Sequence, residues 1–538
     1  QMLHASSENQ YQTMLSEIYE EYQKTLKKNN ALDFDDLLFF TIQIFSDFPK
    51  ILEKYQNRWQ YISVDEYQDT NHVQHALIKL LAKKHNNVCV VGDPDQSIYS
   101  FRGALIENIL HFEKDFPAAK TIKLEQNYRS TQNILSASNG LIQNNQQSAE
   151  KRLWTESGAG DKVSIYERKD EKHESESIAK LIRSFYESNI SNYSDNAILY
   201  RTNAQSRAIE EALLKYQIPY KIIGGLKFYA RKEVKDILAY LRILHNPLDT
   251  ISLLRIINVP ARKIGKSSLV KLQSFAASRS LSLFEVMKHI DMVDNLTPAA
   301  KKAFLSFYEL YEFLAKERKL HSLSSLLDLV ITESGYREML LKEKSIENQS
   351  RLENLEELKS VASRYDTLEE DSLKLFLEEV SLVQDSDSIE ENDDAVLLMT
   401  IHTAKGLEFD NVYIIGVEED LLPHSQSMND DYSLEEERRL MYVAMTRAKK
   451  TLMIFHALQR MIYGKSSYAQ PSRFIAEISA DFCHYIQAYP GQAFQGHQNQ
   501  GFSNPQDPDA QFYHTNSHNH ESVSQDSDGY IYDEDSQV

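Results

Sequence analysis

The chain has 538 residues, more than one domain usually contains, and its length predicts roughly three to four domains. Hydrophobic residues make up 42% and charged residues 26%, so most of the chain should be globular and soluble. The net charge of −20 argues against a general nucleic-acid coat, but it leaves open a strand held in a local groove by stacking and a few cations. The two cysteines suit a reducing cytoplasm, and without an apolar run of about 18 residues we expect no membrane helix.

The N-terminal residues, 1 to about 28, are polar and rich in Tyr and Glu, and they predict a helix. Because the chain opens on Gln1 rather than Met, we interpret it as a fragment of a longer protein. From Ala31 onwards short apolar runs alternate with helical segments, which predicts parallel sheets with ligands at the carboxyl ends of the strands. The expected buried strands are residues 61–64, 88–91, 197–200, 396–399, 412–417 and 452–455.

Two stretches depart from this alternation. Residues from about 226 to 390 are rich in Leu, Lys and Glu with helical periodicity, and the strand pattern resumes at Val396, which predicts a helical domain inserted into the second α/β unit. The tail from about residue 486 is rich in Gln, Asn, Ser and His, has no means of building a core, and is expected to be disordered. We expect its four histidines to belong to a solvated linker, with weak metal binding as the alternative. The tail could bind a partner such as RNA polymerase or a repair protein.

Carboxylates and an amide follow the first two expected strands. Asp65 and Glu66 come directly after residues 61–64 in the string Asp-Glu-Tyr-Gln-Asp-Thr-Asn. An Asp at a strand end can hold Mg²⁺ beside phosphates, and the next Glu can orient or deprotonate a water molecule. Gln96 follows residues 88–91, and its amide could sense a γ-phosphate because it both donates and accepts. The alternatives are a solvated acidic loop and an ordinary Gly-Asp-Pro turn.

These two blocks resemble motifs II and III of the UvrD/PcrA/Rep group of superfamily 1 DNA helicases, and of its PcrA-like members in particular. Further blocks follow in the order of that family and resemble the segment before motif II, motif IV, the next block, motif V and motif VI: residues 31–38, 124–130, 199–207, 399–409 and 442–448. The resemblance implies an α/β fold with tandem RecA-like parallel-sheet domains, the first incomplete, and a mostly helical inserted domain. The implied divisions are the end of a first insert (1–28), the first RecA-like domain (29–118), the second (119–225 and 393–485), its insert (226–392) and the tail (486–538).

The resemblance also implies roles around bound ATP and Mg²⁺. Asp65 would assist the Mg²⁺ and Glu66 would activate the attacking water. Gln96 would contact the γ-phosphate. Tyr128 would stack on the adenine, as a flat aromatic suits a purine, and Arg129 would reach the γ-phosphate from the second α/β domain.

Motifs V and VI add further implied nucleotide contacts. Arg447 would act as an arginine finger, because a guanidinium keeps its charge and offers a fork of donors. Glu408 and His402 would bind nucleotide and relay its state to the γ-phosphate sensor. Ser433 and Glu436 form a capping-box pattern that predicts the start of the motif VI helix. Taken alone, Arg447 would more often be a surface arginine and His402 an interior histidine.

DNA contacts are implied by the same resemblance. Tyr99, Phe101 and Arg102 offer two aromatics and a cation at a spacing that suits base stacking and phosphate contact on single strands. Phe101 stands where the family usually has Trp, so it would stack over a smaller area. Asn203, His424 and Tyr463 also match DNA-contact positions of the family. These matches are less specific, because such residues are more often part of a core.

The phosphate-binding loop G-x-x-x-x-G-K-[ST] does not occur in this sequence. Gly265-Lys266-Ser267 is not such a loop because Pro260 stands where its first Gly is required; this block resembles the segment of the family's second insert that approaches duplex DNA. A helicase–nuclease would need a C-terminal Lys with carboxylates, and the tail has no Lys.

The resulting hypothesis is an ATP-dependent 3′–5′ DNA helicase or translocase. It would act on single-stranded DNA and on junctions with duplex, in repair or replication, and without a membrane partner. We expect it in the bacterial cytoplasm near the nucleoid, and we expect this chain alone to be inactive. The alternative is a truncated remnant that binds DNA or a partner but hydrolyses no ATP.

Overall fold

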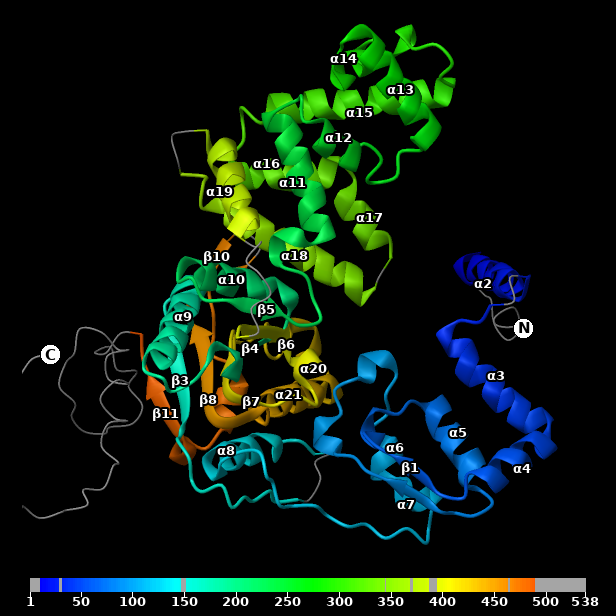
Figure 1. Cartoon of the computed structure of the whole chain (residues 1–538), viewed down its shortest axis with the longest axis vertical. Helices are drawn as coiled ribbons and strands as arrows, with labels where there is room; N and C mark the ends of the chain where they lie inside the picture. Colours follow the sequence, from blue (N-terminus) through cyan, green and yellow to red (C-terminus); the bar gives the residue numbers. More distant parts are fainter. Residues whose placement is uncertain are drawn as a thin grey trace, which may run out of the picture.

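The computed structural model describes residues 10–28, 31–146, 151–343, 345–367, 371–386, 394–462 and 465–488. A seven-stranded sheet with the order β11-β3-β8-β7-β4-β6-β5 is parallel throughout, and a separate parallel pair, β1 and β2, lies in the N-terminal part. A large helical segment stands above the seven-stranded sheet in Figure 1. The predicted class, α/β with parallel sheets and a mostly helical region, is confirmed.

The N-terminal part is built from short elements: α2 (Gln10–Lys28), α3 (Phe34–Asp47), α4 (Pro49–Arg58), β1 (Ile62–Val64), α5 (His72–Ala82), β2 (Val88–Val90), α6 (Glu107–Leu110) and α7 (Phe112–Asp115). Helix α3 begins where Asp33 and Asp36 form a reciprocal capping box. The prediction that its two strands are buried was wrong, because both are only half-buried and Tyr61, just before β1, is 83% exposed.

The seven-stranded sheet has helices on both faces, as its largely buried central strands require. In β4 alternate side chains enter different cores: Leu199 packs with α8 and α21, whereas Ile198 packs with α9 and α10. The elements of this part are β3 (Val163–Arg168), β4 (Asn196–Tyr200), β5 (Tyr220–Ile222), β6 (Val396–Thr400), β7 (Phe409–Ile414), β8 (Ala448–Ala457), β11 (Cys483–Ile486), the hairpin β9 (Gln459–Ile462) with β10 (Lys465–Tyr468), and α8 (Gln132–Ile142), α9 (Glu171–Glu187), α10 (Ser206–Lys215), α20 (Ile401–Ala404), α21 (Asp431–Met445) and α22 (Arg473–Glu477).

The helical segment lies between β5 and β6, two strands that pair with each other in the sheet. Its own core gathers around α11, whose residues Val234 and Ile237 to Leu241 are buried. The helices are α11 (Lys232–His245), α12 (Thr250–Ile256), α13 (Lys266–Arg279), α14 (Leu283–Lys288), α15 (Pro298–Glu317), α16 (Leu323–Glu333), α17 (Tyr336–Lys342), α18 (Ile346–Ser363) and α19 (Ser372–Ser386).

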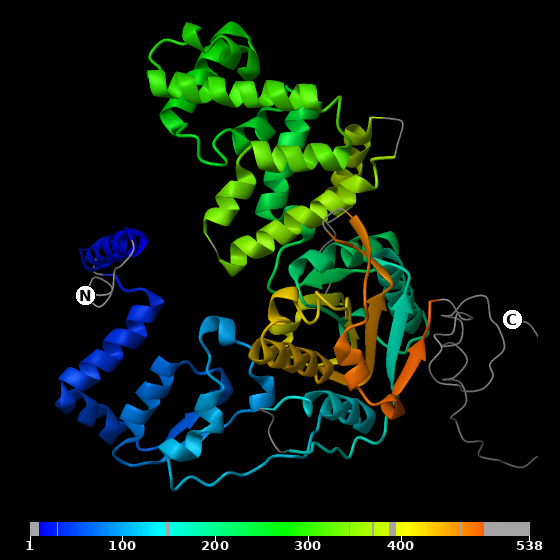
Figure 2. The same ribbon diagram turned by 180° about the vertical axis from the view of Figure 1, so that it is seen from behind.

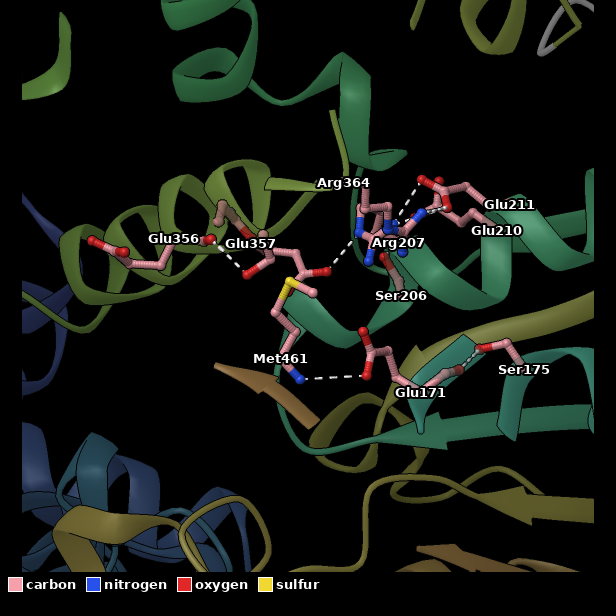
Figure 3. Close-up of polar contacts among 12 residues, drawn as sticks. Glu171, Ser175, Ser206, Arg207, Glu210, Glu211, Glu356, Glu357, Arg364 and Met461 are labelled. Atoms are coloured by element: carbon pink, nitrogen blue, oxygen red, sulfur yellow. Dashed lines mark hydrogen bonds and ion pairs between the residues drawn. The ribbon is translucent and has the colours of Figure 1, made fainter. Parts of the chain in front are cut away.

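A buried ion network attaches this helical segment to the sheet (Figure 3). Arg207 of α10, 1% exposed, donates through Nε to Glu357 Oε1 of α18 at 2.5 Å and through Nη1 to both oxygens of Glu211 at 2.8 Å. Arg364 reaches Glu211 at 3.4 Å. Burial opposes the charge, but the two carboxylates raise the pKa of Arg207 above its ordinary value, so the guanidinium remains charged.

In the part of the chain that the structure describes, no helix combines the length and the apolar character needed to cross a membrane. The predicted disorder of the tail and the interpretation of its histidines concern residues that, from 489 onwards, lie outside the described ones.

Candidate functional site

Two loops meet at the carboxyl ends of β1 and β2. Asp65 directly follows β1 and is exposed, and Glu66 has a left-handed backbone (φ 49°, ψ 43°) that a residue with a side chain adopts at a cost. Gln68 joins the loops, because its Nε2 donates to Glu66 Oε2 at 2.5 Å and its Oε1 accepts from the backbone N–H of Asp93 at 3.0 Å. A Cβ on Gly92 would lie 2.4 Å from this Oε1 and 2.8 Å from Ile109 Cδ1, so a larger residue there would have to displace these side chains.

Gln96 is held by groups on both of its ends. Its Nε2 donates to Asp93 Oδ2 at 2.7 Å, and its Oε1 lies 3.4 Å from Nη2 of Arg447, at the upper limit for a hydrogen bond. Asp93 follows β2, whereas Arg447 follows α21. The amide therefore bridges the two-stranded and the seven-stranded parts of the chain.

Lys405 is a central residue that the sequence analysis did not single out. Its Nζ donates to the backbone carbonyl of Gln96 at 2.7 Å and to Asp69 Oδ2 at 2.5 Å, and it lies 3.6 Å from Glu66 Oε2. Burial raises the pKa of Asp69, and Lys405 opposes that rise. A lysine inside the motif V string was visible in the sequence, but nothing local showed that it would cross to the carboxylates after β1.

Arg447 is buried and fixed by backbone carbonyls. It is 2% exposed, and it donates through Nε to the carbonyl of Val443 at 3.1 Å and through Nη1 to that of Leu407 at 3.2 Å. Burial, followed by the neighbouring charge of Arg129, lowers the pKa of Arg447 to about 10. At neutral pH the guanidinium still carries its charge, and the interpretation of a surface arginine is excluded.

The helix before Arg447 begins earlier than the sequence suggested. Helix α21 begins at Asp431, and its N-cap is Asp430, whose carboxylate accepts from the backbone N–H of Ser433 at 2.9 Å. The predicted capping box at Ser433 was wrong, because an aspartate three residues earlier supplies the acceptor that the first turn needs.

A second arginine lies at the same edge of the large sheet. Arg129 donates through Nε to Glu408 Oε2 at 2.7 Å and through Nη1 to the carbonyl of Thr446 at 3.2 Å. Hydrogen bonds from Arg129 and from Lys449 lower the pKa of Glu408. Tyr128 is 82% exposed, so its ring is open to a stacking partner.

The edges at which these residues lie differ from the expectation for parallel sheets. Asp65 and Gln96 follow β1 and β2, but Glu408 precedes β7 and Arg447 precedes β8. Asp65 and Gln96 thus lie at the carboxyl ends of the small sheet, whereas Glu408 and Arg447 lie at amino ends of strands of the large sheet. Figure 2 and Figure 1 both show α20 and α21 on the side of the large sheet that faces the N-terminal part.

An aromatic cluster lies next to this junction. The ring centroids of Tyr99 and Phe101 are 5.9 Å apart, and the guanidinium of Arg102 lies 5.4 and 5.5 Å from them. The ring of His402 meets Phe101 edge-on at 5.4 Å, and Tyr99 donates to the backbone carbonyl of His402 at 3.2 Å. Burial, followed by Arg201, lowers the pKa of His402 to about 3, so this imidazole is neutral at physiological pH.

The remaining predicted DNA contacts lie at or near the ends of other strands. Asn203 follows β4 in a short 3₁₀ turn (Asn203–Gln205) and is half-buried. The backbone N–H of His424 donates to Glu437 Oε2 at 3.1 Å, and Glu437 also pairs with Arg201 at 2.7 Å, the residue that faces His402. Tyr463 lies outside the described residues.

The donors near β1 suit a hard cation. Asp65 offers carboxylate oxygens, and its Oδ1 accepts from the backbone N–H of Glu66 at 2.8 Å, which orients the carboxylate. Within the described ranges no group of three or more His, Cys, Asp or Glu side chains could hold a metal. Such a donor set fits Mg²⁺ bound through one or two carboxylates, water and phosphate, and does not fit an all-protein cage.

Comparison with known proteins places this site in context. A model of the UvrD-like helicase C-terminal domain matches residues 122–459, and one of the UvrD/REP helicase N-terminal domain matches residues 1–117. The chain is 50% identical over 487 residues to the ATP-dependent DNA helicase PcrA of Staphylococcus epidermidis, covering 90% of this chain and 66% of that protein. It is also 50% identical over 470 residues to the ATP-dependent DNA helicase PcrA of Staphylococcus aureus, covering 86% and 64%. The chain thus spans slightly less than two thirds of the length of these curated relatives.

A solved structure, the C-terminal domain of a possible DNA helicase from Lactobacillus plantarum, aligns over 67% of this chain and 99% of that one. Its TM-score is 0.26 and its identity 10%, a likeness too low to support a conclusion.

Proposed function

Because the chain belongs to the UvrD/REP helicase family, we propose that it works as part of an ATP-dependent 3′–5′ DNA helicase. The observation that carries the proposal is the set of contacts on Gln96, in the loop after β2. From the part with the large sheet, Lys405 Nζ lies 2.7 Å from the carbonyl oxygen of Gln96 and Arg447 Nη2 lies 3.4 Å from its Oε1. A nucleotide phosphate at this position would therefore interact with both parts of the chain.

The proposed chemistry is hydrolysis of a phosphoanhydride. Asp65 would hold Mg²⁺ through water, and the ion would offset phosphate charge. Glu66, which follows the strand end in a left-handed backbone conformation, orients the attacking water and accepts its proton. Arg447 and Arg129 stabilise the charge that develops on the transferred phosphoryl group, and Arg447 is prepositioned by its bonds to backbone carbonyls.

Nucleotide and DNA are coupled through a short segment. Gln96 would sense the γ-phosphate, and the stacking residues Tyr99 and Phe101 follow within the same loop. Arg102 adds a cation for the DNA backbone beside both rings. His402, neutral and packed against Phe101, belongs in this proposal with the DNA-facing cluster rather than with the nucleotide.

The other roles follow from family membership and the placement of the residues. Tyr128 stacks on the adenine, Glu408 fixes Arg129, and Asn203 and His424 extend the DNA path beyond the aromatic cluster. The large sheet (119–225 and 393–485) and the first part (29–118) act as two motor domains, and 226–392 as an insert. The protein works on single-stranded DNA and its junctions with duplex, in the bacterial cytoplasm.

Measurement of DNA-stimulated ATP hydrolysis tests the proposal. It compares this chain with a version extended upstream through a phosphate-binding loop, and each with its Glu66→Gln variant. We expect hydrolysis in the extended version only, and its loss on Glu66→Gln. No hydrolysis in the unsubstituted extended version would leave the second candidate, a protein that binds DNA or a partner without hydrolysing ATP.

A further inference from the structure

A half-buried lysine outside every motif discussed above joins the two parts of the chain. Lys151 lies between α8 and β3, and its ammonium forms ion pairs with Asp93 and with Asp95, the latter at 3.2 Å. The side chains of Lys151 and Asp95 are 14% and 1% exposed. The ammonium also lies 5.6 Å from the ring centroid of Tyr442 on α21. Lys151 therefore reaches from the large sheet into the loop that follows β2.

Asp93 connects this lysine to Gln96. One carboxylate oxygen, Oδ2, accepts from Gln96 Nε2 at 2.7 Å, while the other, Oδ1, faces Lys151 and accepts from the backbone N–H of Asp95 at 3.1 Å. A carboxylate accepts but does not donate, so only the NH₂ end of the amide can face it. The oxygen of Gln96 is thereby directed towards Arg447.

The charge of Lys151 is needed to keep Asp93 in this position. Burial lowers the pKa of an ammonium, but Tyr442, Asp93 and Asp95 together raise the pKa of Lys151 above its ordinary value. An uncharged side chain there would remove the ammonium that pairs with both carboxylates, of which Asp95 is 1% and Asp93 22% exposed. Such a pair relieves its repulsion by protonation or by movement, and either change removes the acceptor that orients the amide.

We propose that Lys151 is a positioning residue that sets the orientation of Gln96 through Asp93, and that this orientation is established only when the two sheets are docked. The catalytic half of this inference rests on the proposed function, since it uses Gln96 as the phosphate sensor. The structural half, the ordering of the loop after β2, does not depend on ATP.

The first experiment measures hydrogen exchange of this chain by mass spectrometry, comparing Lys151→Met, Lys151→Arg and the unsubstituted protein. Lys151→Met should exchange about tenfold or more faster in peptides covering residues 93–99, while Lys151→Arg and peptides from α9 remain unchanged. Lys215→Met is the matched control, because Lys215 forms an exposed pair with Glu176 at 2.8 Å. Unchanged exchange of residues 93–99 in Lys151→Met would overturn the proposal, whether or not the protein hydrolyses ATP.

The second experiment uses the version extended through a phosphate-binding loop. Lys151→Met should lower kcat for DNA-stimulated ATP hydrolysis about tenfold or more with little change in KM for ATP, and Lys151→Arg should restore it. In a Gln96→Ala background the lysine substitution should have no further effect, because its effect passes through Gln96. Additive losses in the double variant would show a general structural role and contradict the inference. Absence of hydrolysis in the unsubstituted protein would instead count against the proposed function.

Discussion

Replacing Arg207 by Met should loosen the helical segment from the large sheet. Arg207 is 1% exposed and bonds to Glu357 and Glu211, whose side chains are 19% and 22% exposed. Removing one partner of a fully buried pair costs about 3–5 kcal/mol. Because both carboxylates keep some access to water and Arg364 still reaches Glu211, we expect a smaller cost, about 2–3 kcal/mol. This corresponds to roughly 30- to 150-fold more frequent opening at this junction.

Hydrogen exchange and calorimetry measure this effect directly. A chain of several domains does not unfold in a single step, so the exchange of peptides from α18 is more informative than one melting temperature. These peptides should exchange faster in Arg207→Met, whereas peptides from α21 should not change. Arg183→Met is the control, because Arg183 forms an exposed pair with Glu187 within α9 at 2.7 Å.

A double substitution tests the electrostatic reasoning. If the cost arises from an orphaned carboxylate, adding Glu357→Gln to Arg207→Met should recover about 1–2 kcal/mol, because the uncompensated charge is removed. Equal exchange of α18 in Arg207→Met and in the unsubstituted protein, or a further loss with Glu357→Gln, would refute the account of the network.

Three further predictions concern the site. Phe101→Ala should weaken binding of single-stranded DNA by about 1–3 kcal/mol per base stacked, and Phe101→Trp should strengthen it. If the two variants and the unsubstituted protein had equal dissociation constants at one fixed salt concentration, stacking at this position would be contradicted. Gly92→Ala should disorder the loops after β1 and β2, since its Cβ would lie 2.4 Å from Oε1 of Gln68, and loss of exchange protection at residues 65–70 measures this. The pKa of His402 is lowered from 6.5 to about 3, so the folded state binds fewer protons than the unfolded chain between these values. The free energy of unfolding should therefore fall as pH falls from 6.5 towards 3, by up to about 1.4 kcal/mol per pH unit. Urea titrations at several pH values should show a weaker dependence in His402→Asn. Equal dependence of the unfolding free energy on pH in both proteins would exclude a buried neutral imidazole.

Residues at strand ends could be predicted because their signal is local. Asp65 and Gln96 each follow a short apolar run, and the residue types alone indicate which chemistry they can support. Lys151 and Lys405 could not be found in this way, since each acts on partners far away in the sequence. The residues around Lys151 give no sign that it will pair with two carboxylates, because the compensation comes entirely from tertiary contact.

The burial of the strands could not be predicted from the sequence either. Apolar runs located both β1 and β4, yet β4 is fully buried and β1 is half-buried. Burial depends on what packs on each face, and the runs themselves carry no information about that. The capping-box pattern at Ser433 predicts that the helix before Arg447 starts there, but the nearby Asp430 caps it instead. Local patterns thus locate an element more reliably than they fix its environment or its first residue.

The contacts of α21 suggest how the proposed nucleotide and DNA sites would move together. Near its start Glu436 accepts from the backbone N–H of Ser100 at 3.0 Å, and just after its end Arg447 lies 3.4 Å from the side-chain amide of Gln96. From Glu437 to Met445 every residue of the helix is buried, so the helix is packed on all sides and moves as a rigid element. A displacement large enough to separate Arg447 from the sensor must therefore also pull on the backbone next to Phe101. Coupling between a bound phosphate and a stacked base would then require no long chain of side chains, because one helix contacts both Gln96 and Ser100, the two ends of a short loop.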